Sequence, residues 1–496
     1  MSAGPRSVVV VGGGSVAWIA ALALRRTFRH LPLDVTVLDT GPDATGPRVH
    51  WTLPSQRGAH AQLGVGEGEF LRATGATFRL ASEHTGWQGG ERRYVHAHGE
   101  IGTPIDVTPF YKWIVERTLA GKTERAEDWS IAALAARNGR FAQPMGAEKE
   151  LTASFTYGFH VDERAYATFL RSAADRGGVR RIVGTLADVQ RAADGRVETL
   201  RLADGGQVSA DFFVDASGAG ALLMSRVDDT PRLDWRRWFP CDRAIAGLAP
   251  GEVDPAAMTR TLAGDNGWSW RVPLMGATAV GGYHASAFGG DDALRAGLER
   301  VAPGLRDVAV VPVTAGRRQK FWVNNCVALG AAAVELEPLA GAHLHLAQLG
   351  LAAFMELFPL DSHPAAEAAE YDAQMAAYAD RLRDFTLAHY RAGPRRPGAF
   401  WDAVHAEPLP DSLAAKLDPW RASGRLTIAD FETFEETDWA WLLIGAGDRP
   451  QALELRVADE VRKLLPVEAE SLRQTIARLA SSMPRHGDFL RRLHAR

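Results

Sequence analysis

Three consecutive glycines near the start of the chain constrain its fold more than any other feature. The run Gly12-Gly13-Gly14-Ser15-Val16-Ala17 follows the predicted apolar strand Ser7 to Val11 and opens a predicted helix. This order fits the G-x-G-x-x-G/A fingerprint of a βαβ unit. Gly12 permits the tight turn, Gly14 lets a pyrophosphate approach the backbone, and Ala17 lets the helix pack closely on the strand. The pattern predicts a dinucleotide site.

The helix from about Ser15 to Phe28 and a second strand, Val35 to Asp39, complete this βαβ unit. The free N–H groups of the helix N-terminus, beginning at Ser15, and its positive dipole end favour a phosphate group. Asp39 at the end of the second strand can accept hydrogen bonds from ribose hydroxyls. Because strand, glycine loop, helix and acid occur in this order, we favour a nucleotide site over an unrelated glycine-rich turn.

Two later segments favour FAD over NAD as the cofactor. Phe212 to Gly218, which includes Asp215, and Cys326 to Ala332, which includes Gly330, are both apolar strands that end in a small-residue turn. Such elements close over the flavin in FAD folds, and NAD dehydrogenases do not need them. The sequence has no second glycine fingerprint for a nicotinamide cofactor. We therefore expect reduced flavin to come from another protein, or NAD(P)H to bind transiently.

Composition excludes several classes of protein. The chain has 496 residues, of which 46% are hydrophobic and 23% charged, and its net charge of -4 does not point to nucleic acid or an anionic membrane. No apolar stretch approaches the roughly 18 residues that a membrane span needs. The two cysteines, Cys241 and Cys326, form neither a disulfide framework nor a metal cluster. After the polar lead Met1 to Arg6 we expect no signal peptide, and a cytoplasmic location.

The predicted fold class is α/β (α+β), a Rossmann-like FAD-binding domain of the monooxygenase type with a mainly helical substrate domain. The polar region from about Gly41 to Glu148 has predicted helices near 109–119 and 130–138. A helix from Asp162 to about Asp175 and strands at 181–190, 197–202 and 208–214 follow, then a strand-rich stretch from Gly267, and helices after about Leu344. We expect a discontinuous FAD domain at 1–70, 155–230 and 305–350, and a substrate region at 71–154, 231–304 and 351–496.

Several short segments, in unbroken order, resemble the flavin-dependent tryptophan halogenase family. They are Gly12 to Trp18, Gly64-Val65-Gly66-Glu67, Tyr157 to Asp162, Val214 to Gly220, Gly267-Trp268-Ser269-Trp270-Arg271-Val272-Pro273, Trp322 to Gly330, and Leu336-Glu337-Pro338-Leu339. The resemblance implies that Gly64, Val65 and Gly66 form a strap at the flavin. It also places Asp215, Gly330 and Leu339 beside the cofactor.

In that family reduced FAD reacts with oxygen to a C4a-hydroperoxide, halide attacks it, and the hypohalous acid crosses a tunnel to the substrate. The resemblance therefore implies FAD, a flavin reductase as partner and a small aromatic substrate or a peptide-borne indole. A homodimer is compatible with it.

Two family positions that carry the halogenation chemistry are changed in this chain. Arg79 occupies the place of the catalytic lysine, and a guanidinium does not become a nucleophilic amine at working pH. Ala340 stands where the catalytic glutamate belongs, and the following Ser-Thr-Gly turn reads Gly341-Ala342-His343. His343 is then the candidate replacement acid. A third change is a shorter segment between Gly66 and Gly75.

The resemblance and the changed positions leave three alternative functions open. The first is a family member with altered, monooxygenase-like chemistry on an aromatic or indole-type substrate, since halide handling is impaired. The second is a genuine halogenase that uses Arg79. The third is a flavin-binding protein without turnover.

Overall fold

The computed structural model describes residues 6–42, 48–146, 150–359, 364–453 and 455–495. The polar lead before the first strand therefore lies, up to residue 5, outside the described residues. The chain forms two compact units, each discontinuous in sequence. The first comprises Met1–Ala76, Val161–Arg236 and Val311–Asp380, and the second Thr77–His160, Arg237–Val310 and Arg381–Arg496. Across the described ranges, no helix is long and apolar enough to cross a membrane.

A six-stranded sheet forms the core of the first unit. Its order is β20 (Trp322–Val323), β21 (Cys326–Ala328), β12 (Phe212–Asp215), β1 (Ser7–Val11), β2 (Asp34–Asp39) and β8 (Arg180–Val183). β1 pairs in parallel with β2 and β12, and β12 with β21. These strands are buried along nearly their whole length, as expected for parallel strands covered on both faces. The predicted return of the chain to this sheet near residues 210 and 325 is confirmed, and so is the α/β fold class.

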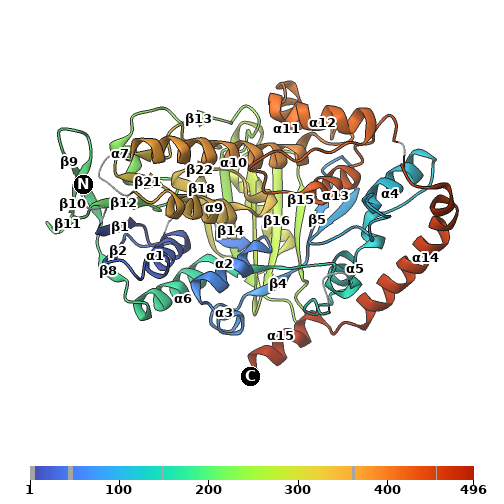
Figure 1. Cartoon of the computed structure of the whole chain (residues 1–496), viewed down its shortest axis with the longest axis horizontal. Helices are drawn as coiled ribbons and strands as arrows, with labels where there is room; N and C mark the ends of the chain where they lie inside the picture. The colour runs from blue at the N-terminus through green and yellow to red at the C-terminus, as the bar shows by residue number, and fades with distance from the viewer. Residues whose placement is uncertain (1–5, 43–47, 147–149, 360–363, 454, 496) are drawn as a thin grey trace. The chain divides into compact units, whose positions relative to one another are not determined.

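Helix α1 (Ser15–Thr27) packs against this sheet and against α6 (Glu163–Arg176) (Figure 1). Its alanines and leucines are buried, and its arginines lie in the last turn, where they favour the negative end of the helix dipole. The remaining elements of this unit are β3 (Val49–Trp51), α2 (Ser55–Leu63), α3 (Glu67–Thr74), β9 (Leu186–Arg191), β10 (Val197–Leu202), β11 (Gln207–Ser209), α7 (Met224–Val227), β13 (Leu233–Asp234), β19 (Gly316–Arg317), β22 (Val334–Glu335), the 3-10 turns η4 (Gly330–Ala332) and η5 (Pro338–Ala340), and α9 (His343–Glu356).

The second unit is built on a seven-stranded sheet. Its order is β18 (Arg306–Pro312), β14 (Arg243–Pro250), β17 (Ala277–His284), β16 (Gly267–Leu274), β15 (Met258–Ala263), β5 (Ala81–Thr85) and β6 (Arg93–Ala97). Aromatic side chains fill its core. Trp268 stacks on Tyr283 with ring centroids 5.3 Å apart, and the ring of Trp87 lies 5.9 Å from that of Trp268. The other elements are β4 (Thr77–Arg79), α4 (Phe110–Leu119), η1 (Ala126–Trp129), α5 (Ile131–Arg137), η2 (Leu151–Ala153), β7 (Gly158–Asp162), η3 (Ser286–Phe288), α8 (Asp291–Val301), α11 (Ala399–Ala406), α12 (Asp411–Ser423), α13 (Glu436–Ala446), α14 (Asp459–Ser482) and α15 (His486–His494). Helix α10 (Ala365–Arg391) contributes its residues up to Asp380 to the first unit and the rest to the second.

Local structure departs from the sequence-based expectation in two places. The polar region contains α2, α3, β5 and β6 in addition to the two predicted helices. The predicted strand 181–190 is broken into β8 and β9 around Gly184, where an added β-carbon would lie 2.8 Å from Cδ1 of Leu202.

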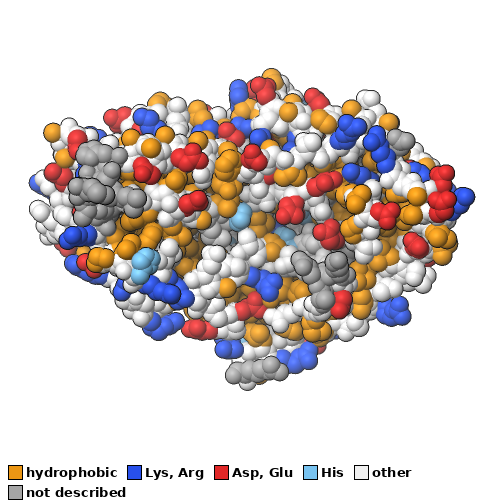
Figure 2. Space-filling view, in the orientation of Figure 1, with side chains coloured by type: hydrophobic (Ala, Val, Ile, Leu, Met, Phe, Trp, Pro, Cys, Tyr) orange, Lys and Arg blue, Asp and Glu red, His pale blue; other side chains and the backbone are white. Residues whose placement is uncertain are grey.

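Figure 2 shows acidic and basic side chains intermixed on the face in view, in keeping with the small net charge.

Candidate nucleotide site and active site

The glycine loop between β1 and α1 has the geometry that its sequence predicts. Gly12 has a φ of +142°, and a β-carbon there would lie 2.4 Å from the carbonyl oxygen of Ala216. Only glycine fits this approach to the loop after β12. Ala17 is fully buried. Gly14, the residue before α1, has an extended backbone. Because glycine has no side chain, it does not cap the N–H groups at the start of the helix.

A carboxylate lies on the N-terminus of α1. The backbone N–H of Ser15 donates to Oε1 of Glu163 over 2.7 Å, and a β-carbon on Gly14 would lie 3.0 Å from the same oxygen. The other oxygen, Oε2, is 2.5 Å from Nε2 of His50. The carboxyl group therefore lies at the helix end where the fingerprint predicts a phosphate, and phosphate binding at this loop stays a prediction.

Asp39 lies at the end of β2, as predicted, but it is already paired. Its Oδ1 accepts the N–H of Gly41 at 3.0 Å, and its Oδ2 accepts both Nε (2.9 Å) and Nη2 (2.7 Å) of Arg181. The carboxylate borders the glycine loop, because a β-carbon on Gly13 would lie 2.4 Å from its Oδ1. Contact of Asp39 with a ribose therefore stays a prediction. Arg181, which binds Asp39, also lies beside the predicted ribose position.

Asp215 shapes the loop that follows β12. Its Oδ1 accepts the N–H and the hydroxyl of Ser217, and its Oδ2 accepts the N–H groups of Leu223 and Met224. These four bonds use the acceptor positions of both side-chain oxygens. The side chain thus organises the loop, and we expect any contact with a cofactor to come from the loop's backbone.

Gly330 and Leu339 belong to the turns beside the glycine loop and α9. Gly330 begins η4 with a φ of +62°, and a β-carbon there would lie 3.3 Å from a methyl group of Val16 on α1. Leu339 is buried within η5, directly before Ala340. The structure therefore brings Gly330 to the fingerprint helix.

Gly64, Val65 and Gly66 form the connection between α2 and α3. Gly64 ends α2 in the left-handed conformation (φ +67°), and Gly66 is the N-cap of α3. The short segment between Gly66 and Gly75 forms helix α3. Helix capping accounts for both glycines without a ligand, and their role as a flavin strap stays a prediction.

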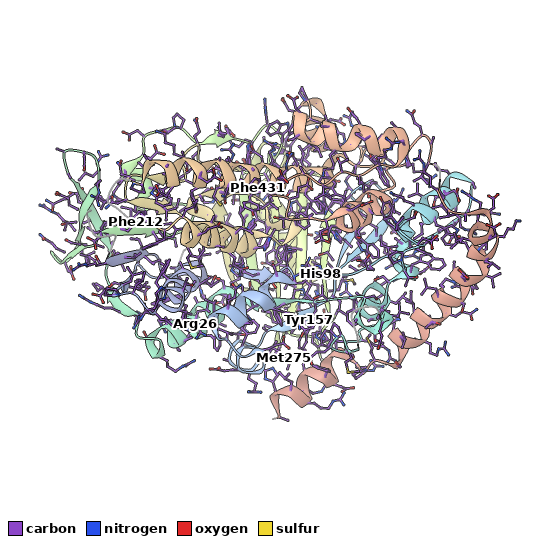
Figure 3. All side chains as sticks on the ribbon, in the orientation of Figure 1. Arg26, His98, Tyr157, Phe212, Met275 and Phe431 are labelled. Carbon is purple, nitrogen blue, oxygen red and sulfur yellow. The ribbon has the colours of Figure 1, made fainter. Side chains whose placement is uncertain are left out.

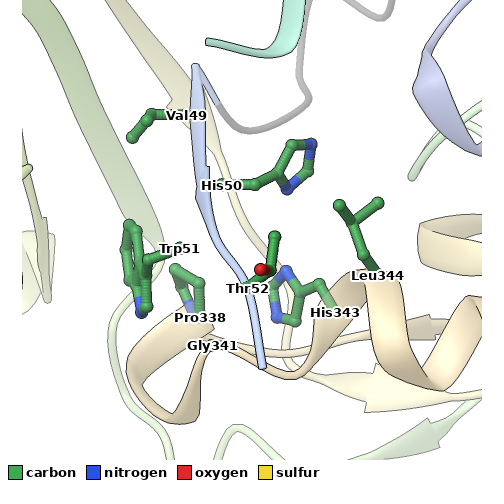
Figure 4. Close-up of a pocket in the computed structure, with 8 residues that line it drawn as sticks. All are labelled: Val49, His50, Trp51, Thr52, Pro338, Gly341, His343 and Leu344. Atoms are coloured by element: carbon green, nitrogen blue, oxygen red, sulfur yellow. The ribbon is translucent and has the colours of Figure 1, made fainter. Parts of the chain in front are cut away.

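His343 begins α9 and lines a small cavity in the first unit (Figure 4). In the figure His50 and Thr52 lie on the same side of the β3 segment as His343, and Val49 and Trp51, which also line the cavity, lie on its other side. Burial lowers the pKa of His343 to about 4, and nearby His50 acts in the same direction. The imidazole is neutral near pH 7, which weakens the physical basis for His343 as an acid. That role stays a prediction.

Arg79 ends β4 in the second unit and is almost completely buried. Its Nη1 donates to Nε2 of His98, labelled in Figure 3, and its Nη2 to the hydroxyl of Ser82, both over 2.8 Å. Burial lowers the pKa of Arg79 to about 9, although Asp438 favours the charged form. The guanidinium therefore remains a cation at neutral pH.

His98 accepts a hydrogen bond from Arg79 because it is neutral. Burial and then the charge of Arg79 hold the pKa of His98 well below its ordinary value. Arg79 is therefore a fixed donor group within its unit. His343 and Ala340 belong to the other unit.

A family model for tryptophan halogenases matches residues 7–461. The chain belongs to the tryptophan halogenase family. Tryptophan 7-halogenase RebH of Lentzea aerocolonigenes is 26% identical over 539 residues, covering 99% of each chain. The solved structures of BrvH from Brevundimonas sp. BAL3 and of Xcc4156 from Xanthomonas campestris, both flavin-dependent halogenases, are each 31% identical, with a TM-score of 0.91 and coverage of 99% of both chains.

FAD is the cofactor of the tryptophan halogenase family, and the first unit fits it. The glycine loop is packed so closely that a β-carbon at Gly12 or Gly13 would clash with neighbouring atoms. The carboxylate of Glu163 accepts the N–H of Ser15, where a phosphate oxygen of FAD would bind. Gly12, Gly14 and Ser15 would hold the pyrophosphate, with Asp39 near the ribose.

Sequence reasoning missed Glu163, His50, Arg181, His98 and Ser82. Glu163 follows Asp162, which caps α6, and reads as an ordinary acidic residue of a first helical turn. Arg181 and His98 carry no motif. Their importance arises only from pairing across the fold.

Proposed function

We propose that this chain is a flavin-dependent halogenase of an electron-rich aromatic, indole-type substrate in which Arg79 takes the place of the lysine. The observation that carries the proposal is the full-length similarity to two structures described as flavin-dependent halogenases. It favours halogenation over the monooxygenase-like chemistry that we expected first from the sequence.

The environment of Arg79 supports an assisting role. Its guanidinium is buried, charged and held at two nitrogens by His98 and Ser82. A fixed cationic donor in a dry site can stabilise negative charge that develops on an oxygen, at little reorganisation cost. It cannot act as an amine nucleophile. Bound reduced FAD would supply the two electrons that activate oxygen, and Arg79 would orient and polarise the resulting oxygen-bearing oxidant.

Oxygen transfer without halogen is the second candidate, and Ala340 is the observation that favours it. This position is a buried methyl group, so no carboxylate assists the aromatic substitution there. A flavin-binding protein without turnover is the third reading.

Product mass separates these functions. Purified protein would be supplied with FAD, a flavin reductase, NADH, oxygen and either chloride or bromide, and incubated with tryptophan, an indole-bearing peptide, a phenol and a pyrrole. A halogenase gives the isotope pattern of chlorine or bromine in a halide-dependent product. Gain of one oxygen regardless of halide would instead establish the monooxygenase-like function, and flavin reoxidation with every aromatic unchanged would establish the third.

We also propose that reduced FAD comes from a separate reductase, because the sequence has one nucleotide fingerprint. Without added reductase the protein should oxidise NADPH slowly or not at all. Rapid NADPH oxidation by the chain alone would contradict this two-component arrangement.

A further inference from the structure

Glu163 links the glycine loop to the residues around the small cavity of the first unit. One oxygen accepts the N–H of Ser15 at 2.7 Å, and the other lies 2.5 Å from His50. His50 lines the cavity that also contains His343. Glu163 is mostly buried, with 17% of its side chain exposed. This contact therefore belongs to the interior of the nucleotide site.

The N-terminal ends of two helices lie close to the side chain of Glu163. Glu163 is the first residue of α6, and its carboxylate reaches the first N–H of α1, so it lies near two positive helix ends. Its own N–H donates to the carbonyl of Arg48, and the Arg48 side chain pairs with Asp162 over 3.1 Å. The backbone that carries Glu163 is thereby fixed.

A pyrophosphate on the fingerprint loop needs the position that Glu163 occupies. The N–H of Ser15 has one hydrogen to donate, and the carboxylate oxygen already accepts it. The same oxygen would lie 3.0 Å from a β-carbon on Gly14, so it fills the approach that this glycine leaves open. Two anions cannot share this position, because like charges at such a distance repel strongly.

We propose that Glu163 is a resident competitor of the FAD pyrophosphate, which must leave the N-terminus of α1 when the cofactor binds. The competition lowers FAD affinity and makes the flavin readily exchangeable. This inference rests on the proposed use of FAD at the fingerprint loop. Exchange matters there because reduced flavin has to arrive from a second protein in each turnover.

The test measures binding of FAD to the full-length apoprotein by isothermal titration calorimetry. Glu163→Gln keeps the size of the side chain and removes its charge, so the dissociation constant of FAD should fall about tenfold, the scale of one anion–helix-dipole interaction. Inorganic pyrophosphate, used as a second probe, should also bind more tightly to this variant. The melting temperature of the apoprotein should fall, because α1 loses its bound anion.

Glu69→Gln is the matched control. Glu69 is an exposed carboxylate of the same unit, paired with Arg176 at 3.1 Å, and its loss changes the net charge equally. It should leave FAD affinity unchanged. If Glu163→Gln bound FAD as weakly as the wild type or more weakly, Glu163 would be a structural or supporting group and the proposal would be overturned. If neither protein bound FAD at all, the assignment of FAD to this loop would fail together with it.

Discussion

Gly341 lies against Trp51 so closely that no other residue fits. A β-carbon at position 341 would be 2.5 Å from the carbonyl oxygen of Trp51 and 2.7 Å from Cδ1 of its indole, and Gly341 has a φ of +70°. Where the resemblance implies a serine, this chain has a glycine that makes room for tryptophan. The change in the Gly341-Ala342-His343 turn is therefore coupled to β3.

The first prediction is that Gly341→Ser destabilises the protein. The new side chain meets the backbone of Trp51, and the serine backbone is forced into the left-handed conformation, so we expect a loss of about 2 kcal/mol or more in the free energy of unfolding. Urea unfolding followed by circular dichroism measures it. Gly290→Ser is the control, because Gly290 caps α8 with a negative φ and nothing within 4 Å. Equal stability of both variants would contradict the steric argument.

A second prediction concerns the glycine loop. Gly14→Val should abolish FAD binding, because a β-carbon at Gly14 points toward the carboxylate of Glu163, in the space that a phosphate requires. Flavin fluorescence quenching measures the affinity. Gly58→Val on the exposed face of α2, where nothing lies within 4 Å, should bind FAD normally. Full flavin affinity in Gly14→Val would show that the fingerprint assignment is wrong.

The parts of the fold that the sequence predicted are local in sequence or strongly periodic. The order β1, glycine loop, α1 and β2 depends on neighbouring residues, and the late strands β12 and β21 are short apolar runs that end in small residues. By contrast β5 pairs with β15, about 180 residues away, and nothing local to β5 indicates that partner. Polar composition around β5 concealed a buried sheet strand.

The candidate site shows the same limit. Gly64 and Gly66 fit a flavin-strap motif, yet their conformations match those of helix caps, because glycine serves both purposes. Glu163 carried no signal, since its contact with Ser15 depends on how α6 approaches α1. Charge pairing between distant segments, as for Asp39 and Arg181, can be recognised only in the folded structure.

A third prediction concerns acid sensitivity. Burial lowers the pKa of many histidines: His60, His84, His98, His160, His343, His345, His389 and His486. The unfolded chain therefore binds more protons than the folded protein between about pH 6.5 and pH 4. Stability is fully present above pH 6.5 and falls as the pH decreases, by about 1.4 kcal/mol per pH unit for each such histidine at most.

Urea unfolding at a series of pH values measures this dependence. His343→Gln should reduce the slope between pH 6.5 and pH 4, because that side chain no longer contributes a proton difference. His30→Gln, at an exposed position, is the comparison. A free energy of unfolding that stays constant down to pH 4 would mean that these histidines titrate normally in the folded protein.

The last prediction concerns Arg79 and chemistry. Arg79→Gln keeps a neutral polar donor at this position but removes the charge and the guanidinium donors to His98 and Ser82, so halogenated product should form at least about a hundredfold more slowly, as when one donor to a developing oxyanion is lost. Arg473→Gln makes the same change at an exposed ion pair with Glu470 and should be silent. Arg79→Lys combined with Ala340→Glu restores both family residues and should exceed the wild-type rate. Undiminished halogenation by a folded Arg79→Gln variant would show that the oxidant is assisted elsewhere.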